Sequence, residues 1–410
     1  MNKDLKENWK KTFAIIWAGQ AASLLTSAII QSAIVWHIAA ETGSATVLSV
    51  AAMFGYIPMA VFGPFIGSLI DRWPRKRIMI AADLFIALTS AFLAVLAFDG
   101  ELGIFAICSA LLARAIGTAF HSPCLQAVTP MIVPKDQLAR CGGYSYTLQS
   151  VALVASPAIA AALYPILPFW MLMLLDVVGA ACGILTIAVC RIPELEPSEP
   201  RPLRLVFSEA YEGLQSMRQI KGLLALTVIG SLFSLAYIPV ASLYPLMSMS
   251  YFGGTTTHAG IVEAAFSGGM VLGGLTLGIW GGTKNKMKEI SAATLVMGLT
   301  LVAMGLLRPS GFVLFAILTL ATGFSAPFFS TPFMAIYQQK VPAEVLGRVL
   351  GISGAMMTLA CPLGLAMSGL FAERIGITNW FILSGGLTLA CFVMLVGFRS
   401  TRRLDVEDKK

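Results

Sequence analysis

The sequence predicts an all-α polytopic membrane protein with twelve transmembrane helices in two six-helix halves. Of its 410 residues, 57% are hydrophobic and 12% are charged, whereas soluble domains carry about a quarter charged residues. Its apolar runs are continuous and about twenty residues long, the length that a helix needs to cross a bilayer. Strands of a membrane barrel would instead alternate over about ten residues. A repeated segment divides the runs into two sets of six.

The first six predicted helices cover residues 13–39, 46–66, 79–98, 103–125, 143–165 and 170–190. The second six cover residues 222–249, 258–281, 290–307, 312–332, 348–371 and 377–398. Four lysines precede the first run, as they would in a signal peptide, but this run is too long for the apolar region of a signal. We therefore predict that it is retained as the first helix.

The positive charges are distributed unevenly among the loops. All but three of the 28 Lys and Arg residues fall in segments that the predicted helices place on one side of the membrane; the three are Arg114, Arg308 and Arg374. Short loops rich in Lys and Arg remain cytoplasmic. We therefore predict a multi-pass protein of the bacterial cytoplasmic (inner) membrane with both termini in the cytoplasm. The same loops account for the formal net charge of +7, so no nucleic-acid binding is expected.

One segment of eight residues occurs twice in the chain. VPKDQLAR at residues 133–140 recurs as VPAEVLGR at residues 341–348, an offset of 208 residues. Each copy follows the fourth helix of its half. Parallel six-helix repeats are a transporter architecture, with the substrate site between the repeats near the bilayer midplane. We predict an N-terminal half at residues 1–190 and a C-terminal half at residues 222–410.

The linker between the halves, residues 191–221, is hydrophilic and begins with several prolines. Apolar residues then recur at helical spacing from Phe207 to Met217, which predicts an amphipathic helix on the cytoplasmic surface. A plain tether between the halves is the alternative interpretation.

The basic turn between the second and third helices, GSLIDRWPRKRI at residues 67–78, is too highly charged to lie in lipid. This turn resembles the loop 2–3 signature of the major facilitator superfamily, G-x-L-x-D-R-x-G-R-K. The matching residues are Gly67, Leu69, Asp71, Arg72, Arg75 and Lys76, and Pro74 stands at the position of the second glycine. The resemblance implies the major facilitator fold and a gate formed by these residues. The alternative is that the charges serve only to set the membrane topology; this explains the lysine and arginine residues but not Asp71. The second half has an eroded counterpart at residues 278–288, with Gly282 at the position of Asp71.

Further stretches resemble the macrolide-efflux (Mef-type) permeases of this superfamily; they are residues 16–30, 62–68, 114–124, 127–135 and 141–146. The resemblance implies a secondary active transporter that exports amphipathic drugs, macrolides in particular, by proton antiport and alternating access. The implied partners are a small amphipathic molecule, protons and the lipid bilayer, and the protein is expected to be a monomer. No cofactor, metal ion or enzyme activity is expected.

Three other functions compete with this interpretation. An exporter of a siderophore or another metabolite would have the same fold. A membrane-embedded enzyme would need clustered catalytic groups, yet His37, His121 and His258 are far apart in the sequence. A channel would need a filter-like segment, which the sequence does not contain. Direct coupling to ATP is not expected, because no P-loop sequence is present.

Charged residues within predicted helices are candidates for proton coupling, because their burial in a membrane is costly. Arg114 lies about eleven residues from the end of its helix, near the midplane. It stays protonated and so cannot carry the proton, but it can stabilise a nearby carboxylate. The candidate carboxylates are Asp83, Asp176 and Glu263. We favour Asp176 and Glu263 as protonatable or cation-attracting groups. Asp83 can instead snorkel to the membrane surface or pair with the basic turn, and Glu263 can instead reach the lipid headgroups. A static ion pair of Arg114 is the alternative.

Polar residues at helical spacing are candidates for the substrate cavity. The first helix presents four of them on one face, the fourth helix two beside Arg114, and the seventh helix two; they are Gln20, Ser23, Ser27, Gln31, Thr118, His121, Ser234 and Tyr237. Polar groups are disfavoured against lipid, so they should face other helices or an aqueous cavity. Hydrogen bonding and packing between helices are the alternative.

Four glycines in the eighth helix have the small-x-x-x-small spacing that allows helices to approach closely. They are Gly269, Gly273, Gly274 and Gly278. We interpret them as packing residues.

Overall fold

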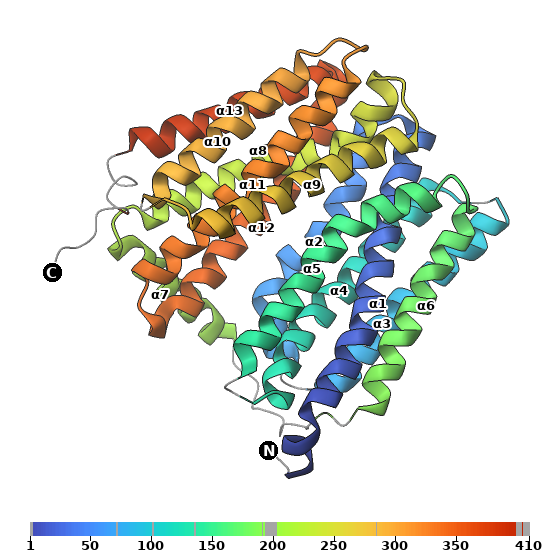
Figure 1. Ribbon diagram of the computed structural model, residues 1–410, viewed down its shortest axis with the longest axis vertical. Coiled ribbons are helices and arrows are strands. Elements are labelled where there is room, and N and C mark those ends of the chain that lie inside the picture. The colour runs from blue at the N-terminus through green and yellow to red at the C-terminus, as the bar shows by residue number, and fades with distance from the viewer. Residues whose placement is uncertain are drawn as a thin grey trace. The chain divides into compact units, whose positions relative to one another are not determined.

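The computed structural model describes residues 3–70, 73–100, 102–134, 137–190, 192, 203–283, 285–398 and 404, and this part of the chain is helical almost throughout (Figure 1). The helices are α1 (Lys3–Thr42), α2 (Ala45–Ile70), α3 (Arg75–Phe98), α4 (Ile104–Ile132), α5 (Leu138–Leu163), α6 (Phe169–Val189), α7 (Leu203–Gln219), α8 (Leu223–Leu246), α9 (Thr256–Trp280), α10 (Lys286–Gly305), α11 (Phe312–Lys340), α12 (Ala343–Ile375) and α13 (Ile377–Gly397). A π-helix, Met247–Tyr251, continues α8.

Over the described residues, eleven helices are long and apolar enough to cross a membrane. They are all the helices named above except α5 and α7. α5 has only part of its side chains described and lies where the fifth span is predicted. The predicted class, an all-α polytopic membrane protein, is confirmed.

The predicted amphipathic helix of the linker is present as α7. Its Glu212 carboxylate accepts a hydrogen bond of 2.5 Å from Arg348 on α12. Gly213 lies against the same residue, because a Cβ atom there would come within 2.8 Å of the Arg348 carbonyl oxygen. The ion pair is largely exposed and so contributes at most about 1 kcal/mol. The close approach at Gly213 therefore matters more for seating α7 on α12.

Contacts between helices group the chain into two compact units. Unit 1 consists of Met1–His37 and Ile57–Arg201, and unit 2 of Ile38–Tyr56 and Pro202–Lys410. In unit 1, α3 packs along α6 and α4. In unit 2, α9 packs along α11, α10 along α11 and α13, and α8 along α12. The predicted boundaries of the two halves remain a prediction.

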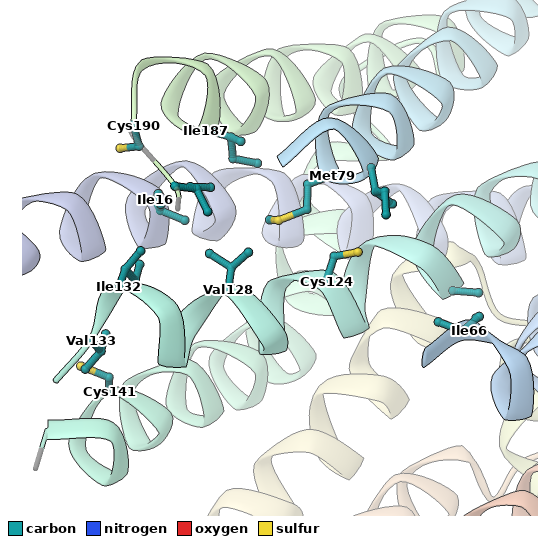
Figure 2. Close-up of a cluster of buried hydrophobic side chains, with 13 residues drawn as sticks. Ile16, Ile66, Met79, Cys124, Val128, Ile132, Val133, Cys141, Ile187 and Cys190 are labelled. Atoms are coloured by element: carbon teal, nitrogen blue, oxygen red, sulfur yellow. The ribbon is translucent and has the colours of Figure 1, made fainter. Parts of the chain in front are cut away.

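Unit 1 is stabilised by a cluster of buried apolar side chains from α1, α2, α3, α4, α5 and α6 (Figure 2). Its members are Ile16, Ile66, Ile78, Met79, Ala119, Cys124, Val128, Ile132, Val133, Cys141, Ile187, Cys190 and Ile192. Figure 2 shows the three cysteine side chains among aliphatic neighbours. Cysteine here serves as a small apolar packing residue.

In unit 2, α9 and α11 pack backbone against backbone. A Cβ atom on Gly269 would lie 2.2 Å from the carbonyl oxygen of Leu320, and one on Gly273 would lie 2.1 Å from that of Phe324. By contrast, nothing lies within 4 Å of such an atom at Gly274 or Gly278. Of the four glycines predicted to serve packing, the first two therefore do so in this contact.

Candidate functional site

Arg114 and Asp176 form a buried ion pair within unit 1. Arg114 on α4 is 5% exposed and Asp176 on α6 is 0% exposed. Nη1 of the guanidinium donates to Oδ2 of the carboxylate and, at 2.6 Å, to Oγ of Ser90 on α3. The Ser90 hydroxyl donates in turn to Oδ2 of Asp176 at 2.7 Å. Ser27 on α1 donates to Oδ1 at 2.6 Å. Four helices thus meet at one carboxylate.

This network satisfies both oxygens of the Asp176 carboxylate. The guanidinium opposite it stays protonated. A buried charge is tolerated in an apolar interior when it is paired and hydrogen-bonded. The geometry therefore suits a permanent ion pair, which holds α1, α3, α4 and α6 together.

A second polar cluster lies on the same helices and is less completely paired. Asp83 on α3 is 3% exposed, and its Oδ1 lies 3.4 Å from Nε2 of His121 on α4. Gly183 on α6 leaves room for it, because a Cβ atom there would lie 3.0 Å from Oδ2 of Asp83 and 3.3 Å from Nε2 of Gln20. Among the described residues, neither Oδ2 of Asp83 nor Nε2 of Gln20 has a hydrogen-bond partner.

This cluster joins an acid, an imidazole and an amide whose hydrogen-bonding capacity is only partly used. Unpaired buried polar atoms are rare in proteins and often mark functional positions or the place of a water molecule. Histidine is the side chain whose charge normally changes between pH 5 and pH 8. The Asp83–His121 contact was not expected from the sequence, which allowed Asp83 to pair with the basic turn.

Two cations of the basic turn contact other helices in unit 1. The Lys76 ammonium donates to the carbonyl oxygens of Ala188 at 2.7 Å and Cys190 at 2.9 Å. These groups end α6, where carbonyls lack helical partners and attract cations. Nη1 of Arg75 donates to the carbonyl oxygen of Ala127 at 3.2 Å on α4. Burial raises the pKa of the Cys190 thiol, and the Lys76 ammonium opposes that shift.

The two cations therefore do more than set topology: they tie α3 to α4 and α6. Of the other predicted gate residues, Gly67 lies in the last turn of α2. Asp71 and Arg72 lie outside the described residues.

The remaining predicted site residues are placed as follows. Ser23 is buried on α1, while Gln31 and Thr118 are exposed. The Thr118 hydroxyl donates to the carbonyl oxygen of Arg114 in its own helix. Glu263 is partly buried on α9 in unit 2.

Ser234 and Tyr237 are buried on α8 in unit 2. The Tyr237 ring stacks on Phe233 with centroids 5.4 Å apart, and Phe233 stacks on Phe329 of α11 at 4.4 Å. These contacts are the helix packing that the sequence allowed as the alternative to a cavity wall.

Two buried polar residues are not among the predicted site residues. Ser90 links Arg114 to Asp176, and its spacing of seven residues from Asp83 places both on one face of α3. That spacing would have identified it. Glu289 on α10 is 5% exposed and was overlooked because it directly follows the lysines of a predicted loop.

Comparison with known proteins gives a consistent family. A sequence profile described as transmembrane secretion effector matches residues 8–410. The chain is 45% identical over 404 residues to macrolide efflux protein A of Streptococcus pyogenes, covering 98% of this chain and 99% of that protein. It is 26% identical over 395 residues to the multidrug efflux pump Tap of Mycolicibacterium fortuitum, covering 91% and 92%.

Solved structures agree on the fold. A bacterial homologue of the iron transporter ferroportin, in an inward-facing state, superimposes with a TM-score of 0.74 at 13% identity, covering 94% of this chain and 98% of that one. At this identity the likeness concerns the fold alone. The resemblance that the sequence motifs indicated is confirmed: the chain belongs to the transmembrane secretion effector family of the major facilitator superfamily and is a multi-span membrane transporter, not an enzyme.

Proposed function

We propose that this protein exports macrolides or similar amphipathic drugs from the bacterial cytoplasm in exchange for protons, by alternating access. The similarity to macrolide efflux protein A supports the cargo, because it extends over 98% of the chain at 45% identity. The protein acts as a monomer in the cytoplasmic membrane, with both termini in the cytoplasm. The observation that carries the proton coupling is the incompletely paired cluster of Asp83, His121 and Gln20.

The two buried acids of unit 1 have different tasks in this proposal. Asp176 receives donors on both oxygens and faces a guanidinium, so protonation would cost it several favourable contacts. Asp83 faces an imidazole on one oxygen and has an unused second oxygen among the described contacts. A proton can therefore bind at Asp83 with less loss. Asp83 is the proton carrier, and Arg114 with Asp176 holds the surrounding helices in place.

The coupling has enough energy for useful export. A membrane potential supplies about 2.3 kcal/mol per charge per 100 mV, and each 1.4 kcal/mol corresponds to about a tenfold ratio. One net charge moved inward per drug molecule therefore supports a gradient of roughly fiftyfold at 100 mV. A macrolide carries a tertiary amine, and its protonated form would also suit an acidic partner such as Glu263.

In the proposed mechanism, the basic turn between α2 and α3 forms the gate on the cytoplasmic side. Asp71 and Arg72 close this side, and Arg75 and Lys76 attach the turn to α4 and to the end of α6. Alternating access in this architecture moves one repeat against the other. The turn lies between two helices of one repeat and so can transmit that movement.

The test is accumulation of radiolabelled erythromycin in a drug-sensitive bacterial host, with and without a protonophore. Cells that express the protein should accumulate less drug, and the protonophore should remove the difference. Asp83→Asn, at matched expression, should remove it as well. Asp99→Asn is the matched control, because Asp99 is an exposed carboxylate at the end of the same helix. Unchanged accumulation from the well-expressed protein would overturn macrolides as cargo.

A further inference from the structure

The turn between α9 and α10 in unit 2 corresponds in sequence to the basic turn of the first half. An offset of 211 residues pairs Gly67 with Gly278, Arg75 with Lys286 and Arg77 with Lys288. The same offset pairs Asp71 with Gly282, so the acid is missing, while two of the four cations of the first turn, Arg75 and Arg77, correspond to lysines. By sequence alone, this turn looks like a copy that has lost its acidic residue.

In the structure, a carboxylate from another position occupies the space beside Gly282. Glu289 lies in the first turn of α10 and is 5% exposed. Its Oε1 accepts a hydrogen bond from the backbone N–H of Thr283, and its Oε2 lies 3.9 Å from Nζ of Lys286. A Cβ atom on Gly282 would lie 2.6 Å from Oε1 of Glu289 and 3.2 Å from Nζ of Lys286. The Glu289 carboxylate thus occupies the space that a side chain at position 282 would enter.

We propose that Glu289 replaces the missing aspartate and is the positioning residue that holds the α9–α10 turn in its transport-competent conformation. A carboxylate is favoured there by the positive end of the α10 dipole and by the Thr283 N–H. Gly282 adopts φ +72°, a left-handed conformation in which a Cβ atom is disfavoured. Glycine at 282 and glutamate at 289 are therefore complementary: the first gives the turn its conformation and leaves room, and the second supplies the charge.

The surroundings explain why this acid has a strong effect on the turn. A cavity of about 320 Å³ is lined by α9, Lys286, Glu289 and part of α11, and a second one of about 650 Å³ by Trp280, Lys288, Glu289 and Phe324, among others. Glu289 lines both cavities. Its carboxylate contacts with Thr283 and Lys286 join the turn to the start of α10 beside these hollows.

The test moves the acid back to the position that the first half uses. Glu289→Ala should expose the turn, and trypsin in inside-out membrane vesicles should cut at its three lysines about tenfold faster, the effect expected for losing a hydrogen bond to a charged group. Adding Gly282→Asp to Glu289→Ala should restore slow cleavage. The matched control adds Gly282→Asn instead, since Asp and Asn tolerate left-handed backbone about equally but only Asp brings the charge.

Drug export should follow the same order: lost in Glu289→Ala and in the Asn control, and recovered in the Asp variant. The cleavage measurement does not depend on the cargo, so it can fail or succeed independently of the proposed function. The export measurement with erythromycin rests on the proposed function. If the wild-type protein also fails to export erythromycin, the proposed cargo is wrong, and the cleavage measurement alone tests Glu289. Equal cleavage in wild type and Glu289→Ala, or equal recovery by Asp and Asn, would overturn the role of Glu289. Arg308→Gln, an exposed cation just beyond the other end of α10, should leave export unchanged.

Discussion

Arg114 and Asp176 are joined twice inside unit 1, once directly and once through the hydroxyl of Ser90. The two residues are 62 positions apart in sequence and lie on α4 and α6. Their pairing gives the buried arginine a partner and connects these helices to α1 and α3. This pair is a structural anchor in the proposed mechanism, and the neighbouring Asp83–His121 contact is the site of proton coupling.

An anchor of this kind predicts strongly non-additive mutations. Arg114→Met or Asp176→Leu alone leaves an uncompensated buried charge and should destabilise the protein by about 3–5 kcal/mol. The double variant replaces both charges by apolar groups and should be close to wild type in stability, since buried ion pairs are often replaceable in this way. Thermal unfolding of the purified protein in detergent measures this. Additive losses in the double variant would refute the anchor.

The Asp83–His121 contact predicts a change in pH dependence. His121→Gln keeps a polar side chain beside Asp83 but cannot change its charge between pH 5 and pH 8. Drug export measured across this range should therefore become flatter than in wild type, while protein abundance stays the same. Asp83→Asn should abolish net export altogether. A wild-type pH profile from His121→Gln would show that the imidazole takes no part.

The contact between α9 and α11 predicts different effects for neighbouring glycines. Gly273→Ala places a methyl group 2.1 Å from the Phe324 carbonyl oxygen, and overpacking of this kind costs about 1–3 kcal/mol or more. Gly274→Ala meets nothing within 4 Å and should be neutral or stabilising by up to about 1 kcal/mol, because alanine favours helix. The two melting temperatures decide the matter. Equal effects at both positions would contradict the close contact.

A contact inside unit 2 predicts a disulfide that stops transport. Oγ of Ser49 on α2 lies 3.1 Å from Oγ of Ser368 on α12, and both residues are buried. α2 belongs to the first repeat in sequence and α12 to the second, so alternating access should separate them. Ser49→Cys with Ser368→Cys, in a variant without the seven native cysteines, should cross-link on oxidation and lose export reversibly. Full export from the cross-linked protein would show that these helices stay together.

Much of the fold follows from the sequence, for physical reasons. Apolar runs about twenty residues long can satisfy their backbone only as helices in lipid, so the spans were predictable. The amphipathic spacing in the linker likewise predicted α7. The helix ends were predicted less accurately. The predicted span 312–332 continues as α11 to Lys340, because a helix that has left the lipid can continue into water without any cost of burial.

Partners within the site were harder to predict than the site residues. The cost of a buried charge showed that Arg114 needed an acidic partner. The rotation of each helix decides whether that partner is Asp83 or Asp176, and this rotation depends on packing that the sequence periodicity does not give.

Glu289 was not predicted as a site residue for another reason. Its role appears only when the sequences of the two basic turns are aligned and the glycine in one is matched to the aspartate in the other.

The central claim, proton-driven export, is tested most directly with the purified protein in liposomes. Vesicles with an acidic interior are diluted into neutral buffer containing radiolabelled erythromycin, and the initial rate of uptake is measured. Protein-free vesicles give the passive trapping of the drug amine, and nigericin removes the pH gradient. Proton antiport predicts uptake about tenfold faster than in protein-free vesicles, the scale of a 1.4 kcal/mol advantage, with loss of the excess in nigericin and in Asp83→Asn. Uptake by the folded wild-type protein that equals the protein-free rate, or an excess that survives nigericin, would contradict proton antiport.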